Sequence, residues 1–277
     1  MWKYAALISY VGAAYCGWQR QKGTAADGGP SIQATLEEAL RKMLNQPTLT
    51  VVGSGRTDSG VHAAGQVAHF LSRAKEWDPL TLQKGLNSLL PPDIRVLGVQ
   101  SVPIEFHAQH SAVKKQYSYY FQQGPAPLPF LMPYSWWIRK TLDQDAIRDA
   151  LSQLKGEHDF KAFQGAGAKP GPTVRTVLEA EVGWEPISFP GMTPAHSGRP
   201  GTAGDTGLVR VRIQGTGFLK QMVRGISGTL LQIGEGRRPA SDMTRIIQAQ
   251  DRGLVGPTAP ARALWLEQVW YPGLRWE

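Results

Sequence analysis

A short glycine-rich segment contains residue types that can perform nucleophilic chemistry. Residues 53–63 read Gly-Ser-Gly-Arg-Thr-Asp-Ser-Gly-Val-His-Ala and follow a β-branched stretch that predicts a strand. Loops that follow strands often carry catalytic residues. Asp58 offers a carboxylate as nucleophile or base, and Arg56 is a cation two residues away that would keep it ionised. The alternative is a tight turn in which Asp58 only accepts hydrogen bonds from backbone amides.

An aromatic candidate, Tyr117, lies in the segment Lys-Lys-Gln-Tyr-Ser-Tyr-Tyr over residues 114–120. Strand alternation places Tyr117 and Tyr119 on one face. Aromatic residues in strands commonly pack in the core. The neighbouring lysines favour the other interpretation, in which the ring stacks on an unpaired base and the cations bind phosphates.

A second candidate cation, Arg224, lies in a segment with apolar residues at helical spacing. Phe218, Met222 and Ile226 begin a stripe that predicts a helix over 218–233 with this stripe in the core. Lys220 and Arg224 share another face of this helix, and the local sequence alone predicts that this face is exposed to solvent. The alternative is that Arg224 enters a cleft and pairs with a carboxylate.

The overall charge indicates an anionic partner. The 277 residues carry a formal net charge of +8, which favours a nucleic acid or a membrane surface. On a predicted strand at 207–214, Arg210 and Arg212 alternate with apolar residues, so one sheet face is cationic and either binds phosphates or is solvated.

Several other functional classes lack support in the sequence. Cys16 is the only cysteine, so it cannot form an internal disulfide. The histidines show no ligand spacing, and we expect no metal. No glycine-rich phosphate fingerprint follows a strand, so a nucleotide cofactor is not expected. The N-terminus does not resemble a leader segment and no run reaches ~18 apolar residues, which predicts a soluble protein that does not insert into a membrane. The single cysteine fits a reducing, cytoplasmic location.

The elements that would position these residues form two similar series. The first half reads as strand 3–10, a helix starting near Ser31, strands at 48–52 and 66–71, a helix opened by Asp78-Pro79, and strand 94–102. The second half reads as strand 115–122, a helix around 145–155, strands near 173–184 and 207–214, helices at 218–233 and 242–250, and strand 264–271.

This order is that of split βαβ, ferredoxin-like folds. We therefore predict an α+β protein with two ferredoxin-like (RRM-like) halves whose antiparallel sheets join around a central cleft. The expected domains are 1–106, with the Asp58 loop, and 107–277, with Tyr117 and Arg224. Residues 186–206, rich in proline and glycine, predict a surface excursion.

Several motifs together resemble the tRNA pseudouridine synthase A family. They are Tyr-Val-Gly at 10–12, Gly-Trp-Gln-Arg-Gln at 17–21, the segment 55–63, Phe-His-Ala at 106–108, Met-Val-Arg at 222–224 and Ala-Pro-Ala at 259–261. The resemblance covers about the whole chain, and the stretch around Asp58 is its most specific part. Val11 stands where the family usually has an acidic residue, and Arg262-Ala263 stand where it usually has an acidic residue followed by glycine.

Membership of this family would imply a pseudouridine synthase fold and a cofactor-free homodimer. Such an enzyme isomerises uridine to pseudouridine at positions 38, 39 and 40 of the tRNA anticodon stem-loop. Asp58 matches the catalytic aspartate, which attacks either C6 of the base or C1′ of the ribose. Tyr117 matches the aromatic residue that stacks on the target base, Arg56 the arginine that helps displace that base, and Arg224 the basic partner of the aspartate.

Two rival interpretations stay open from the sequence. One is a non-catalytic RNA-binding or RNA-chaperone protein in which Asp58 is only a turn residue. The other is a pseudouridine synthase that acts on other RNA sites, since substrate choice depends on contacts outside the shared fold.

Overall fold

The computed structural model describes residues 1–20, 29–187 and 207–276. The chain divides into two compact units, Met1–Lys115 with Trp265–Glu277, and Gln116–Leu264. The sequence predicts domains at 1–106 and 107–277, which would place the C-terminal strand with the second half. In the structure this strand belongs to the first unit, and the predicted domain division stays a prediction. Most of the segment 186–206, namely 188–206, lies outside the described residues.

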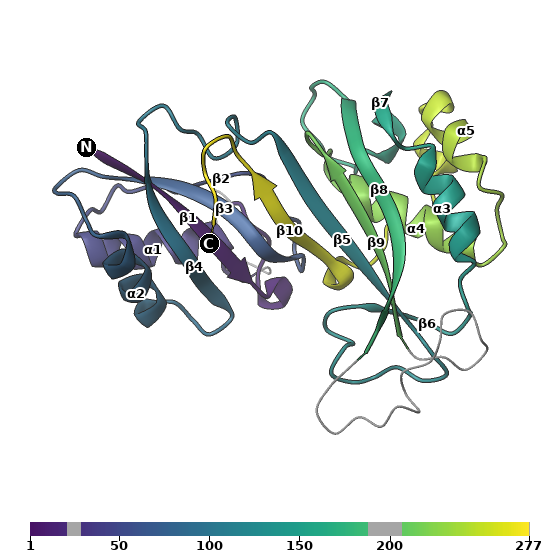
Figure 1. The fold of residues 1–277 in the computed structure, drawn as a ribbon, viewed down its shortest axis with the longest axis horizontal. Helices are drawn as coiled ribbons and strands as arrows, with labels where there is room; N and C mark the ends of the chain where they lie inside the picture. The colour runs from purple at the N-terminus through teal and green to yellow at the C-terminus, as the bar shows by residue number, and fades with distance from the viewer. Residues whose placement is uncertain (21–28, 188–206, 277) are drawn as a thin grey trace. The chain divides into compact units, whose positions relative to one another are not determined.

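The first unit has the strand and helix order predicted for a ferredoxin-like half (Figure 1). Its elements are β1 (Trp2–Tyr10), α1 (Ile32–Leu44), β2 (Val52–Gly53), β3 (His62–Ser72), α2 (Pro79–Leu89) and β4 (Ile94–Val102). β1 lies between β3 and β4 and is antiparallel to both, and β2 is antiparallel to β3. The C-terminal strand β10 (Leu264–Trp270) pairs in parallel with β3.

Local sequence signals account for both helix starts in this unit. The Ser31 hydroxyl accepts a hydrogen bond from the Ala34 amide at 3.2 Å, and the Asp78 carboxylate accepts one from the Thr81 amide at 2.8 Å. Pro79 occupies the first helical position, where a missing N–H costs nothing. Both predicted N-termini are confirmed.

The predicted strand at 48–52 is wrong apart from its last residue. Helix α1 satisfies the backbone of this segment, because Arg41 donates to the Leu49 carbonyl and the Glu37 carboxylate accepts from the Val51 amide at 3.1 Å. With these groups satisfied by side chains, no adjacent strand is required, and β2 is only two residues long.

The second unit repeats the order of the first up to its second helix, with additions, but the predicted closing strand at 264–271 belongs to the first unit as β10. Strands β5 (Lys114–Gln123), β8 (Val174–Pro186) and β9 (Gly207–Gly215) combine with helices α3 (Gln144–Ser152) and α4 (Met222–Gly234). β7 (Gly156–Asp159) extends the sheet beyond β8, and β6 (Trp136–Ile138) pairs in parallel with β5. Helix α5 (Asp242–Ala249) follows α4. The predicted α+β class is confirmed, and most strand pairs are antiparallel.

Helix α4 is the central helix of the second unit and is buried on almost every side. Met222, Ile226 and Leu230 are completely buried, which confirms the predicted apolar stripe. The predicted start at residue 218 is wrong because Gln221 adopts a left-handed conformation with φ 59°. Residues 218–220 form a loop instead, and Gly165 donates its amide to the Lys220 carbonyl.

The predicted cationic face of β9 is neutralised by its neighbour. β8 places glutamates beside both arginines, and Arg210 pairs with Glu185 at 2.5 Å while Arg212 pairs with Glu181 at 2.8 Å. This face therefore has balanced charge, and the solvated-surface interpretation accounts for it. None of the described helices is long and apolar enough to span a bilayer.

The Phe-His-Ala motif at 106–108 packs on a buried histidine of β3. His69 is 8% exposed, its Nδ1 accepts a hydrogen bond from the Ala108 amide at 3.1 Å, and its ring lies 4.9 Å from that of His107. Burial, together with the charges of Lys3 and His107, lowers the pKa of His69 from 6.5 to about 4. The folded protein thus holds His69 neutral where an unfolded chain would protonate it.

This histidine should make stability depend on pH. Below its unfolded pKa of 6.5, the unfolded chain binds a proton that the folded chain does not bind until about pH 4, so the free energy of unfolding falls as pH decreases across that window. His69→Gln should flatten this dependence in urea unfolding at pH 6.5, 5.5 and 4.5. His158→Gln, on β7, serves as the control, and equal slopes in the wild type and His69→Gln would contradict the assignment.

Candidate active site

The loop between β2 and β3 carries Arg56 and Asp58, and side chains from two strands fix its start. Lys115, at the beginning of β5, donates its ammonium to the Ser54 carbonyl at 2.5 Å. Gln66 of β3 is completely buried, donates to the Gly55 carbonyl at 3.0 Å and accepts from the Ser54 hydroxyl at 2.6 Å. The two carbonyls that precede Arg56 are therefore held in place.

The middle of the loop is fixed by the first strand and by the segment after it. The Thr57 hydroxyl lies 2.8 Å from the phenol oxygen of Tyr10, and the Trp18 amide donates to the Thr57 carbonyl at 3.1 Å. Ser59 donates its hydroxyl to the Tyr15 carbonyl at 3.1 Å. Burial raises the pKa of Tyr10 well above its usual value, so its phenol keeps its proton.

Two glycines allow this segment to touch the loop through the backbone. A Cβ at Gly12 would lie 2.0 Å from the Val61 carbonyl oxygen, and one at Gly17 would lie 2.7 Å from that of Thr57. Gly17 also has φ 103°, which L side chains rarely adopt. The Tyr-Val-Gly and Gly-Trp-Gln-Arg-Gln motifs therefore include the positions that shape the loop.

The two candidate functional residues of the loop, Arg56 and Asp58, lie on its accessible side. Arg56 is exposed and Asp58 is half-buried, whereas Ser54 and Thr57 on either side of Arg56 are buried. The Asp58 carbonyl accepts the Val61 amide at 3.1 Å, which closes the turn through the main chain. The turn expected from the sequence is thus present, and the backbone of Asp58 takes part in it.

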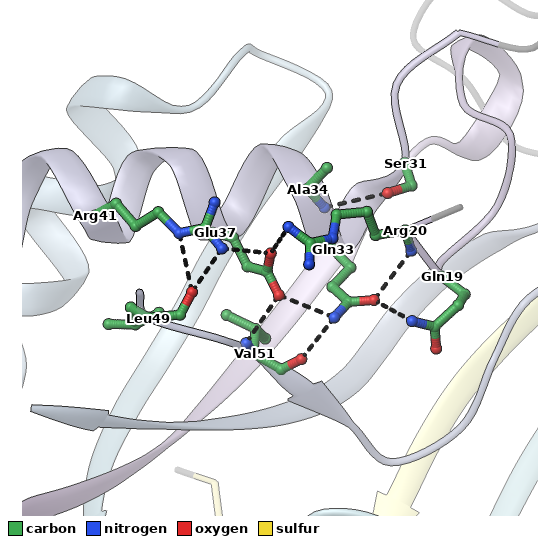
Figure 2. A network of polar contacts seen from close by, with 9 residues as sticks. All are labelled: Gln19, Arg20, Ser31, Gln33, Ala34, Glu37, Arg41, Leu49 and Val51. Carbon is green, nitrogen blue, oxygen red and sulfur yellow. Dashed lines mark hydrogen bonds and ion pairs between the residues drawn. The ribbon is translucent and has the colours of Figure 1, made fainter. Parts of the chain in front are cut away.

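A buried carboxylate connects helix α1 to the chain that leads into the loop (Figure 2). Glu37 is completely buried, and Arg41 at 3.0 Å and Arg20 at 3.4 Å pair with it. Its other oxygen accepts from the Val51 amide and from the Gln33 amide group. Gln33 in turn accepts from Gln19 and from the Arg20 backbone. One acid thereby joins α1, the chain before β2 and the Gly-Trp-Gln-Arg-Gln motif.

Tyr117 is positioned in the second unit by an aromatic contact. It is 7% exposed, and its ring meets that of Phe218 edge to face, with centroids 5.1 Å apart and an interplanar angle of 77°. Tyr119, two residues along the same face, is completely buried. The predicted sharing of one face by these tyrosines is confirmed, and the core-packing interpretation applies to Tyr119.

Arg224 is anchored at the first turn of α4. Its Nε donates to the Ala259 carbonyl at 2.8 Å, and the Ala259 amide donates to the Arg224 carbonyl at 3.1 Å. The phenol of Tyr119 donates to the next carbonyl, that of Pro260, at 3.0 Å. The local sequence predicted a solvent-exposed position for Arg224, and this prediction is wrong because the Ala-Pro-Ala segment packs against Arg224.

The four predicted site residues thus fall into two pairs. Arg56 and Asp58 share one loop of the first unit, and Tyr117 and Arg224 both lie near the start of α4 in the second. The supporting residues Lys115 and Gln66 were not predicted to hold the loop. Gln66 offers a weak signal, a polar side chain inside the otherwise mostly apolar stretch of β3.

The described residues provide no obvious metal site. Among residues 1–20, 29–187 and 207–276, no three His, Cys, Asp or Glu side chains gather closely enough to hold an ion.

Comparison with known proteins decides the family. A family model described as tRNA pseudouridine synthase matches residues 6–111 and 150–272. The chain belongs to this family. A tRNA pseudouridine synthase A of Bdellovibrio bacteriovorus is 38% identical over 96% of this chain and 93% of that protein. One of Geobacter sp. (strain M21) is 37% identical over 96% and 97%, and one of Sinorhizobium fredii is 34% identical over 97% and 99%.

Among solved structures, a chain in a crystal structure of a Cbf5-Nop10-Gar1 complex aligns with 82% of this synthase-family chain and 54% of its own length. The TM-score is 0.30 and the sequence identity 13%. The family assignment rests on the sequence comparisons.

The Glu37 network should contribute strongly to stability. Glu37→Ala would leave the buried Val51 amide without its acceptor and would remove the ion-pair partner of Arg41, and we expect a loss of ~2–4 kcal/mol in the free energy of unfolding. Urea unfolding measures this loss. Glu38→Ala, at the exposed neighbouring position on α1, should change it by less than ~0.5 kcal/mol. Equal effects of the two substitutions would contradict the assigned role of Glu37.

Proposed function

We propose that this chain isomerises uridine to pseudouridine in tRNA, at positions 38, 39 and 40 of the anticodon stem-loop, with Asp58 as nucleophile. One observation carries the proposal: in a member of the tRNA pseudouridine synthase family, a loop fixed on several sides presents Asp58 and Arg56 on its accessible side. A preorganised nucleophile loses little conformational freedom when the substrate binds.

The proposed reaction is an isomerisation and needs no external reactant. The Asp58 carboxylate attacks C6 of the base or C1′ of the ribose, and the N1–C1′ glycosidic bond breaks. The uracil rotates, C5 bonds to C1′, and C5 loses its proton while N1 gains one. Atoms and electrons balance within the nucleotide, and the carboxylate is released.

The other residues serve this chemistry by holding the base and the charge. The ring of Tyr117 would stack on the uracil, which must turn without leaving. Arg56, exposed beside Asp58, would help displace the target base from the RNA stack. Arg224 would pair with Asp58 and keep the carboxylate ionised. Its anchoring to Ala259 supports this role because the bond to Nε fixes the direction of the guanidinium.

The decisive variant is Asp58→Asn, which removes the anionic nucleophile and keeps the shape of the side chain. Turnover on uridine-containing tRNA should fall by ~10³-fold or more, while tRNA binding changes little. Carbodiimide-stopped primer extension maps the product and its position. Asp149→Asn, an exposed carboxylate on α3, is the matched control and should keep full activity.

The same assay separates the rival functions. Normal turnover by Asp58→Asn would overturn the role of Asp58. If the wild-type protein only binds RNA, primer extension will show no new stop after incubation with tRNA. If it is a synthase of other sites, the new stops will lie at positions other than 38, 39 and 40. Mapping total tRNA from cells with and without the gene reports activity and position together.

We also propose a homodimer in the cytoplasm, and the single cysteine supports a reducing compartment. Light scattering should give twice the chain mass of 30.3 kDa, or about 61 kDa, and a mass of one chain would contradict the dimer. Cell fractionation tests the location.

A further inference from the structure

The second unit contains an open hollow of about 500 Å³ that the proposed chemistry does not use. It lies where the C-terminal end of α4 meets α5 and the backbone of residues 253–257. Three of its lining side chains are arginines: Arg237, Arg238 and Arg245. We call it the arginine hollow.

Arg238 forms a fixed part of the wall. Its Nε donates to Asp242 at 2.8 Å, one terminal nitrogen to the Gln232 side chain at 3.1 Å and the other to the Leu254 carbonyl at 2.8 Å. All three guanidinium nitrogens are thus engaged, so Arg238 connects α4, α5 and the 253–257 backbone.

The other two arginines lie at the rim, with their charges toward solvent. The side chains of Arg237 and Arg245 are 52% and 60% exposed, whereas their acidic partners Glu235 and Asp242 are 14% and 12% exposed. Asp242 pairs with the Nε of Arg245 at 3.0 Å. The less exposed Glu235 and Asp242 orient the two guanidinium groups, so the charge that solvent can reach at the rim is positive.

The hollow has a fixed connection to the candidate active site residue Arg224. Gln232 lies eight positions after Arg224 on α4, which is about 12 Å along a helix. Residues 253–259 run back along α4, since Gly256 donates its amide to Thr229 at 3.0 Å and Ala259 contacts Arg224. A Cβ at Gly228 would lie 1.7 Å from the Pro257 carbonyl oxygen, so this contact is between backbones.

We propose that the arginine hollow binds backbone phosphates of the substrate RNA outside the reacting nucleotide. This inference rests on the proposed function. Guanidinium groups match phosphate oxygens with paired hydrogen bonds, and phosphate contacts orient a nucleic acid without reading its sequence. The hollow is open and has two exposed cations on its rim, which suits an extended polyanion better than a small enclosed ligand.

The double variant Arg237→Gln/Arg245→Gln tests this site and leaves Arg238 and Asp242 in place. Its Kd for a tRNA transcript should rise about 10-fold, and the slope of log binding constant against log salt should decrease by roughly 1 to 2, since each lost phosphate contact removes ~0.7–0.9. The KM for tRNA should rise likewise, with kcat unchanged. Arg148→Gln, 58% exposed on α3 and also paired with an acid, is the matched control.

The outcomes distinguish this inference from the proposed function. A double variant that binds tRNA with the same Kd and salt slope as Arg148→Gln would overturn the hollow as an RNA site, and the hollow would then serve a different partner. A lower kcat with an unchanged Kd would overturn it too. Binding and salt slope need no turnover, so a wild-type protein that forms no pseudouridine would refute the proposed function alone. Thermal unfolding within a few degrees of the wild type confirms that the variant folds.

Discussion

The position of Asp58 depends on direct backbone contact between two segments far apart in sequence. Residues 12–18 lie against residues 57–61, and at Gly12 and Gly17 the two backbones approach so closely that a methyl group would collide with the loop. Interiors are close-packed, so such a contact has few alternative arrangements. Hydrogen bonds between Thr57 and both Trp18 and Tyr10 then hold the loop in this position.

Two buried polar side chains, Glu37 and Gln66, and the half-buried Lys115 extend this constraint to the rest of the unit. Glu37 joins α1 to the chain before β2, Gln66 joins β3 to the loop start, and Lys115 joins β5 to the same place. Buried polar groups are costly unless they are satisfied, so each contact also excludes arrangements that would leave its partner unmatched. The loop is therefore specified by surrounding elements more than by its own sequence.

The sequence predicted most elements of the fold because their signals are local. Ser31 and Asp78-Pro79 mark helix starts through hydrogen bonds within one turn, and alternation in β9 shows its buried face. The failures come from distant partners: β8 neutralises Arg210 and Arg212, and α1 side chains satisfy the backbone near Val51. Arg224 looked solvated because Ala259, its partner, is 35 residues away. For the site, the motif gave Asp58 and Arg56, but the residues that hold them lie outside it.

The contact between α4 and residues 253–259 has a consequence for substrate selection. Because the Gly228 backbone meets the Pro257 carbonyl directly, the segment cannot slide along the helix, and the separation between Arg224 and the arginine hollow is constant. An RNA that contacts both must present its phosphates and its reacting nucleotide at that separation. With the proposed phosphate site, the shape of the bound RNA, rather than its base sequence, would set which of its nucleotides lies beside Arg224.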